Sequence, residues 1–321
     1  MRTIFERRAS TILFNLLQSL QYEGIFLIPA NVCPIVPVTF LKAKRRYELV
    51  DISTQTLCMD EQVLIRKLKK APQQYSGVLF VHTFGVQRSF ERLFKAIKEV
   101  ARHALLIDNR CLCVPDFSTK RKTSADAVLY STGYSKYVDM GYGGFAFVKP
   151  TVAYASRRLA YNKAAHESLV AAMRKVQMSN QAFSYHDTDW LDTSTPTISI
   201  ARYRADITAK LPRIHVHKKI LNRIYSDLIP KKNRLERHYQ SWRFNVLVSH
   251  KDELIKEIFK QGLFASSHFP SLRGVFGQGS DHNAANLHSR VVNLFNNERF
   301  SPEQAEQTAA IVSRHIKRFA N

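Results

Sequence analysis

The sequence predicts an α/β protein in which helices cover both faces of a mostly parallel sheet, followed by a smaller C-terminal α/β domain. Short, continuous apolar runs recur along the first half of the chain, and such runs are typical of strands buried on both faces. Segments with apolar residues at helical spacing separate these runs. Beyond residue 240, strand-like and helix-like segments alternate again after a mainly helical region.

The first half contains the elements of the large sheet. All but one of the expected strands are runs of apolar residues that end at a proline, a polar residue or a turn, and the exception, Tyr47–Val50, contains Glu48. The expected strands are Ile25–Ile28, Tyr47–Val50, Val78–Val81, Ala104–Ile107, Ala127–Tyr130 and Phe145–Val148. The expected helices are Thr11–Gln21, Cys33–Lys44, a segment from the capping residue Asp60 to Lys70, and Phe90–Ala101. Because strands and helices alternate, a parallel sheet with helices on both faces follows.

The second half is organised differently. From Pro150 to about Leu228 it is expected to be mainly helical, with an irregular stretch at His186–Thr197. A strand from Arg243 to Val248, helices at Glu253–Lys260 and Pro302–Ile316, and a strand or short turn at Val291–Leu294 follow. Ser301 and Pro302 are a favourable helix start. We therefore expect a large domain over residues 1–195, and connecting helices with a small α/β domain over residues 196–321.

Composition limits the class of protein. The 321 residues are 45% hydrophobic, which suits a buried core. No apolar run reaches the roughly 20 residues that a membrane span needs, and the charged start does not resemble a signal peptide, so a cytoplasmic protein is expected. Of the four cysteines, Cys111 and Cys113 are separated by one residue. This spacing does not match a zinc site, so reduced thiols and no metal are expected.

The charge is strongly basic, with 48 Lys and Arg against 26 Asp and Glu, a formal net charge of +22. Such a balance favours nucleic acid, anionic membranes or phosphate-rich substrates as partners. The basic residues are spread along the chain, however, and no helix-turn-helix, zinc-finger or RNA-binding signature accompanies them. A solvated basic surface is at least as good an explanation, and nucleic-acid binding is not expected.

Several polar groups follow expected strands or begin a helix. Asp108 ends one strand, Ser131 ends the next, Lys136 follows after a short turn, and Ser10 and Thr11 begin the first helix. Ligands of parallel α/β sheets bind at the carboxyl ends of the strands, and a helix N-terminus favours phosphate. These are the groups that pyridoxal phosphate needs: an amine for the Schiff base (Lys136), a carboxylate for the pyridine nitrogen (Asp108), and a phosphate cradle (Ser131, Ser10, Thr11).

Several motifs resemble the DegT/StrS family of pyridoxal-phosphate sugar aminotransferases. The most specific is Ser131-Thr-Gly-Tyr-Ser-Lys136-Tyr-Val-Asp-Met-Gly141-Tyr-Gly-Gly144, whose spacing matches the family's Ser-Phe-x-x-x-Lys-x-x-x-x-Gly-Glu-Gly-Gly. The other similar stretches, in the family's order along nearly the whole chain, are Ile28–Cys33, Leu49–Ile52, Val81–Gly85, Leu106–Cys111 and Gly262–Pro270.

The resemblance implies the type I fold of aspartate aminotransferase, with a seven-stranded sheet. It also implies a homodimer with sites at the subunit interface, a nucleotide-linked keto-sugar as amino acceptor, and glutamate as the usual donor. Lys136 would hold the cofactor and move protons, Asp108 would face the pyridine nitrogen, and Ser131 would bind phosphate. Cys33 would lie against the ring, and Cys111 would lie near its phenolic oxygen.

Other readings remain open. His82 and His268 are candidates for the substrate site, although a histidine after a buried strand is more often a packing residue. The chain differs from the family's pattern in having Ala9-Ser10-Thr11 for Ser-Gly-Thr and Tyr142 for a glutamate, and Asp189–Ser199 has no clear counterpart of the family's Gly-x-Asn-x-Arg. One alternative is a pyridoxal-phosphate enzyme of another reaction type, although Lys136 argues against the related dehydratases, in which histidine replaces the lysine. Another is a catalytically degenerate relative that acts as a basic binding protein.

Overall fold

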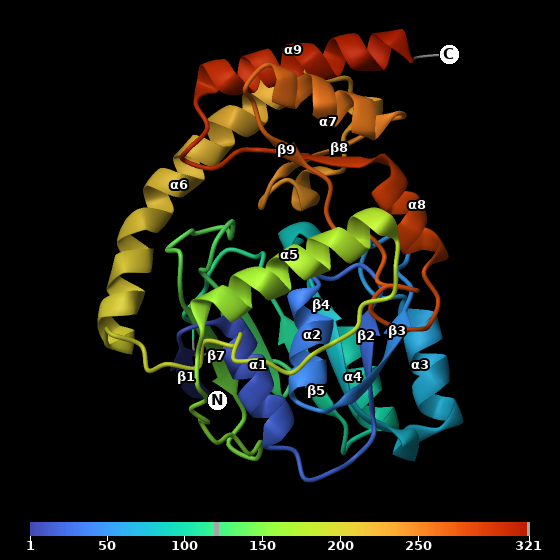
Figure 1. Cartoon of the computed structure of the whole chain (residues 1–321), viewed down its shortest axis with the longest axis vertical. Coiled ribbons are helices and arrows are strands. Elements are labelled where there is room, and N and C mark those ends of the chain that lie inside the picture. The colour runs from blue at the N-terminus through green and yellow to red at the C-terminus, as the bar shows by residue number, and fades with distance from the viewer. Residues whose placement is uncertain (119–121, 320–321) are drawn as a thin grey trace.

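A computed structural model describes residues 1–118 and 122–319 of the chain and contains two sheets (Figure 1). The large sheet has the strand order β1-β7-β6-β5-β4-β2-β3. Its strands are β1 (Arg2–Glu6), β2 (Ile25–Pro29), β3 (Arg46–Val50), β4 (Tyr75–Val81), β5 (Leu105–Asn109), β6 (Ala127–Ser131) and β7 (Gly144–Val148). The prediction of a mostly parallel, seven-stranded sheet flanked by helices is confirmed, because β6, β5, β4, β2 and β3 pair in parallel.

One edge of the sheet is antiparallel. β7 runs antiparallel to β6, and β1 pairs antiparallel with β7 from Arg2 opposite Val148 to Glu6 opposite Gly144. Residues 132–143, which join β6 to β7, contain no helix. A parallel neighbour would need a longer crossover, so the chain returns antiparallel. β1 was not predicted, because its short sequence has no continuous apolar run.

Helices on the two faces of the large sheet form two separate cores. On one face, α1 (Ala9–Gln18), α2 (Ile35–Lys42) and α5 (Lys163–Ser179) pack against the sheet. On the other face lie α3 (Glu61–Lys70), α4 (Glu91–Val100) and the first half of α6 (Ile200–Leu228). Burying apolar surface on both faces stabilises a sheet whose central strands are apolar throughout. The four helices predicted in the first half are confirmed, with ends that differ by a few residues.

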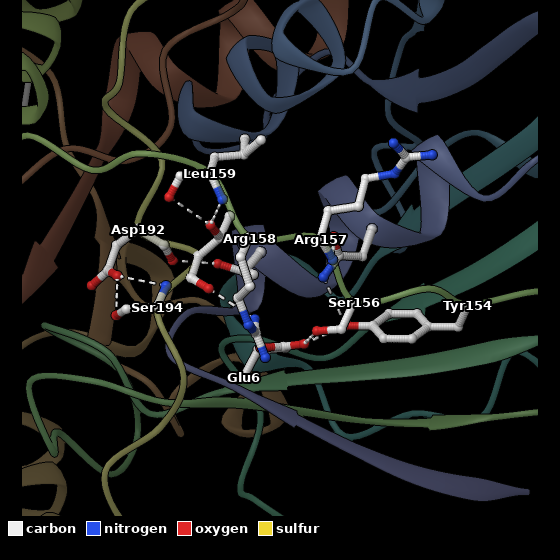
Figure 2. A network of polar contacts seen from close by, with 11 residues as sticks. Glu6, Tyr154, Ser156, Arg157, Arg158, Leu159, Asp192 and Ser194 are labelled. Carbon is white, nitrogen blue, oxygen red and sulfur yellow. Dashed lines mark hydrogen bonds and ion pairs between the residues drawn. The ribbon is translucent and has the colours of Figure 1, made fainter.

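The segment between β7 and α5 corrects one prediction. Residues 153–162 are not helical, and the irregular stretch extends over residues 180–199. Figure 2 shows the reason: the buried Glu6 carboxylate accepts hydrogen bonds from Tyr154 and Ser156 and pairs with Arg158 at 2.8 Å. Arg158 Nη1 also donates to the Thr193 carbonyl at 2.8 Å. These contacts join both irregular segments to one another and to β1.

The C-terminal part contains the second sheet. α6 runs along the molecule from the large sheet to this part, which lies at the top of Figure 1. The antiparallel order is β8-β10-β9. The elements after α6 are β8 (Phe244–Leu247), α7 (Lys251–Lys260), β9 (Ala265–Ser266), α8 (His282–Arg290), β10 (Val291–Leu294) and α9 (Pro302–Arg318). The predicted start of α9 is confirmed by a capping box, in which Ser301 and Gln304 exchange side-chain and backbone hydrogen bonds.

Short 3-10 turns complete the chain at Pro72–Gln74, Thr83–Gly85, Lys231–Asn233 and Arg237–Tyr239. Within the described residues, no helix is long and apolar enough to cross a membrane. The same residues contain no cluster of three His, Cys, Asp or Glu side chains arranged to hold a metal ion.

Candidate active site

A pocket lies where the carboxyl ends of β4, β5 and β6 meet the N-terminus of α1. Its cavity volume is about 140 Å³. Five of the predicted site residues line it together, although they are far apart in the sequence. These residues are Ser10, Cys33, Cys111, Ser131 and Lys136.

One end of the pocket is suited to an anion. α1 begins here, and no side chain caps its N-terminus, so free backbone N–H groups and the helix dipole face the pocket. The hydroxyls of Ser10 and Ser131 and the side chain of Arg8 line the same end. Arg8 Nη1 donates to the Gly141 carbonyl at 2.8 Å, which holds the guanidinium near the lysine loop. A phosphate placed here would meet a helix N-terminus, two hydroxyls and one positive charge.

The loop that carries Lys136 is fixed on both sides. The Lys136 amide donates to the Gly133 carbonyl at 3.3 Å, and the Trp242 indole donates to the Ser135 carbonyl at 2.6 Å. Gly143, with φ of +92°, lies where a Cβ would be 2.6 Å from the Tyr203 ring. Gly143 is therefore needed for both its conformation and its lack of a side chain. The loop presents Lys136 to the pocket from a rigid support.

The two predicted cysteines lie in the pocket wall. Burial raises the pKa of the Cys111 thiol to about 12, although the nearby Lys136 charge opposes the shift. Cys111 is thus held as a neutral thiol, because a thiolate would be poorly solvated here. Its backbone N–H donates to Asn109 Oδ1 at 3.0 Å, and Asn109 also lines the pocket. The four cysteines are free thiols.

Asp108 is placed differently from these residues. Its side chain is fully buried, and it is not among the residues that line the pocket, whereas the next residue, Asn109, is. One carboxylate oxygen lies 2.8 Å from His82 Nε2, and the other lies 2.6 Å from Arg110 Nε. Burial alone would raise the pKa of Asp108, but His82 and Arg110 together lower it below its usual value. The carboxylate is therefore ionised and already has two partners.

Three further predicted residues lie outside the pocket lining. The Thr11 hydroxyl donates to the Asp192 carbonyl at 2.7 Å, and the Thr11 amide donates to Arg8 O. His82 Nδ1 faces the Val86 carbonyl at 2.8 Å, so both of its ring nitrogens have oxygen neighbours. His268 precedes Phe269, a lining residue, and burial with the nearby Arg243 charge lowers the pKa of His268 to about 4.

Sequence reasoning missed Arg8, Asn109 and Arg110. Arg8 directly precedes the first helix. A basic residue just before a helix that begins at a phosphate site could have indicated a phosphate ligand. Arg110 lies two residues after Asp108, so on a strand its side chain points to the same side. That spacing could have indicated an ion pair.

Pyridoxal phosphate needs a phosphate site, an amine and a partner for its ring nitrogen, and the residues present fit the first two. The uncapped α1 N-terminus with Ser10, Ser131 and Arg8 fits the phosphate, and the Lys136 amine shares the pocket. For the ring nitrogen, the expected partner is the Asp108 carboxylate. Asp108 does not line the pocket, although the next residue does, and its carboxylate is paired with His82 and Arg110. A ring nitrogen would have to replace one of these partners, and Arg110, whose side chain is 23% exposed, is the one that can reach solvent.

Comparison with known proteins supports the fold. In sequence, the chain matches no family model and no curated protein. In structure, it is similar to a DegT DnrJ EryC1 StrS aminotransferase from Brucella abortus, with a TM-score of 0.68, 14% identity, and coverage of 98% of this chain and 86% of that one. It is also similar to DesI in the presence of its TDP-sugar product (TM-score 0.71, 15% identity, coverage 100% and 83%). A third similar structure is an E coli GDP-4-keto-6-deoxy-D-mannose-3-dehydratase with bound hydrated PLP (TM-score 0.62, 13% identity, coverage 97% and 87%).

The chain therefore shares its fold with these three solved structures. More particularly, one of them is a DegT DnrJ EryC1 StrS aminotransferase, which has the fold that the sequence motifs predicted.

Proposed function

We propose that the protein is a pyridoxal-phosphate-dependent aminotransferase that moves an amino group from an amino acid such as glutamate to a nucleotide-linked keto-sugar. The observation that carries this proposal is the shared pocket. The Lys136 amine lies in one hollow with an uncapped helix N-terminus, two serine hydroxyls and an arginine. The solved structure of DesI with its TDP-sugar product, which has the same fold, supports the substrate class.

Each part of the pocket has a proposed task. Pyridoxal phosphate, when bound, supplies an electron sink that stabilises negative charge at the carbon next to the transferred nitrogen. Lys136 Nζ would hold the cofactor covalently and, once released from it, would carry a proton to and from that carbon. Ser10, Ser131, Arg8 and the α1 N-terminus would hold the phosphate. Cys33 would lie against the ring, and Cys111 would lie near its phenolic oxygen.

Asp108 is proposed to stabilise the proton on the ring nitrogen. In the arrangement described above, its two oxygens contact His82 and Arg110. For the ring nitrogen to bind, Arg110 would turn toward the depression that it lines with His82 and His215. His82 would remain and fix the orientation of the carboxylate. Arg110 would therefore compete with the cofactor for Asp108.

We also propose that the enzyme acts as a homodimer in the cytoplasm. The dimer follows from the resemblance in sequence to the DegT/StrS family, which builds each site from two chains. The presence of free thiols only, at Cys33, Cys58, Cys111 and Cys113, is consistent with a reducing compartment.

A second function, binding of an anionic partner, is favoured by one observation. A groove between α6 and residues 231–241 is lined by many basic side chains and a single acidic one, Glu236. Nucleic acid would bind such a groove with an affinity that falls steeply as salt rises. A colourless protein that binds DNA in this way would favour the second function.

The decisive experiment concerns Lys136. The purified protein mixed with pyridoxal phosphate should absorb in the violet-blue, and borohydride should fix the cofactor to Lys136, as shown by peptide mass spectrometry. Lys136→Ala should fold but form no adduct in the pocket. Lys163→Ala, at a lysine that is 81% exposed on α5, is the matched control and should behave as the unmodified chain. Adduct formation at another lysine in both variants would contradict the proposal.

A further inference from the structure

The groove between α6 and residues 231–241, the basic groove, is a second hollow suited to an anion. Its cavity volume is about 1120 Å³, and among the described residues it shares no lining residue with the Lys136 pocket. The described part of its lining has six Lys and Arg side chains and two His, against one carboxylate, that of Glu236. The six are Lys218, Lys219, Arg223, Lys231, Arg234 and Arg237.

The cations of the basic groove come from two walls. On α6, Lys219 and Arg223 are four residues apart, so they are neighbours on one face of the helix. On the other wall, Lys231, Arg234 and Arg237 recur at every third residue. Like charges at neighbouring positions destabilise a helix. A ligand with several negative charges would offset this repulsion on both walls.

Most of the exposed charge has no partner within the chain. Within residues 1–118 and 122–319, only Arg223 of the six forms an ion pair, with Asp227 at 3.7 Å, and both of these side chains are exposed. The Glu236 carboxylate lies 3.4 Å from His238 Nδ1 and not beside a lysine or arginine. The basic groove therefore carries an excess of positive charge.

Part of this charge is buried. Lys218 is 4% exposed, and its Nζ donates to two neutral acceptors, the Trp242 carbonyl at 2.9 Å and Asn296 Oδ1 at 2.8 Å. The Nε of Arg234 is buried and has no hydrogen-bond partner. Burying a charge without a counter-charge is costly. Such an arrangement is expected where a ligand supplies the opposite charge.

The two walls are fixed to each other. Asn222 Nδ2 on α6 donates to the Gln240 carbonyl at 2.8 Å. Arg234 Nη1 donates to the Ser226 carbonyl at 2.8 Å, and the Arg234 backbone forms an antiparallel bridge with Val246 of β8. Because the walls are already ordered, a ligand would lose little free energy in arranging them.

We propose that the basic groove binds a small molecule with two or more adjacent phosphate groups, at a site separate from the Lys136 pocket. The proposal does not depend on the aminotransferase function. Cations on both walls can contact neighbouring phosphates together, and a guanidinium can bind two phosphate oxygens. A single nucleic-acid strand is a poorer match, because its bases stack on exposed aromatic faces. The Tyr and Phe side chains of the lining, Tyr137 and Phe244, are only 4% and 1% exposed.

The basic groove also adjoins the lysine loop. Tyr137, the residue after Lys136, lines the groove. Its ring centre lies 4.9 Å from Lys218 Nζ, and its hydroxyl lies 3.4 Å from His215 Nδ1. A polyphosphate bound to Lys218 and His215 would hold both side chains against Tyr137. Binding in the groove is therefore expected to restrain the lysine loop.

Calorimetric titration of the full chain with inorganic tripolyphosphate tests the site. The double variant Lys219→Met/Lys231→Met removes one exposed lysine from each wall and should weaken binding at least about tenfold. The control Lys163→Met/Lys175→Met removes the same charge from exposed positions on α5 and should bind as the unmodified chain does. Equal weakening in both double variants would mean that only net charge attracts the anion, and would overturn the proposal.

Titration with ATP distinguishes the source of the phosphates. If binding depends on Lys219 and Lys231, tighter binding of ATP than of tripolyphosphate would identify a nucleotide as the ligand. Equal or weaker binding of ATP would identify the phosphate groups alone as what the site recognises. A single-stranded oligonucleotide that binds through the same lysines more tightly than tripolyphosphate would assign the groove to nucleic acid and overturn the proposal.

Two further measurements locate the bound anion. Tripolyphosphate binding that is lost in Arg8→Met but kept in Lys219→Met/Lys231→Met would place the anion in the Lys136 pocket and refute the groove site. Amide hydrogen exchange of residues 132–143, measured by mass spectrometry, should slow when tripolyphosphate binds. Unchanged exchange would place the ligand away from Tyr137, contrary to the site described.

Discussion

Replacing Asp108 by asparagine is expected to lower stability more than any exposed charge change. The substitution keeps the volume but removes a fully buried carboxylate that lies 2.8 Å from His82 Nε2 and 2.6 Å from Arg110 Nε. Breaking a buried pair from one side usually costs about 3–5 kcal/mol, because the remaining partner keeps an uncompensated charge. His82 is 1% exposed and cannot reach solvent, whereas Arg110 partly can. We therefore expect a loss near the lower limit, about 3 kcal/mol.

Urea unfolding followed by circular dichroism measures this loss. Asp187→Asn is the matched control, because Asp187 pairs with Lys42 at 2.6 Å but its side chain is 54% exposed. Exposed pairs contribute at most about 1 kcal/mol, so the control should change little. If Asp108→Asn cost less than about 1 kcal/mol, the carboxylate would not be the counter-charge of Arg110. The same variant should bind the cofactor but slow its half-reactions on the order of 10²-fold or more.

Two further predictions concern the loop and the pH dependence. Gly143→Ala should cost about 2 kcal/mol or more in urea unfolding, because its Cβ would lie 2.6 Å from the Tyr203 ring. Gly262→Ala, also at a positive φ but with nothing within 4 Å, isolates the backbone contribution and should cost less; equal losses would exclude the steric explanation. The pKa of His268 is lowered to about 4, so the unfolded chain takes up this proton first, and stability should decrease as pH falls from about 6.5 toward 4. His268→Gln should weaken that dependence between about pH 7 and pH 5, and an unchanged slope would refute the assignment.

The sequence by itself determined the elements whose pattern involves only residues close together in the chain. Most predicted strands of the large sheet are apolar runs, and an apolar run is buried whichever strand lies beside it. The spacing from Ser131 to Lys136 and to Gly144 is also local, so the lysine loop and its place after β6 could be predicted. Ser10, Cys33, Cys111, Ser131 and Lys136 line one pocket because the carboxyl ends of parallel strands share one edge of the sheet.

Only the tertiary structure decided which polar groups face one another. β1 has no apolar run and is a strand because β7 offers it an edge to pair with. Thr11 has the composition of a phosphate ligand, but its hydroxyl bonds to Asp192, which is distant in sequence. Arg243 is one of many basic residues in the sequence, and only packing shows that it is buried without a counter-charge. The periodicity of apolar residues in the sequence indicates which side chains are buried. The energy of a buried polar group depends instead on its partner, and segments distant in the sequence supply that partner.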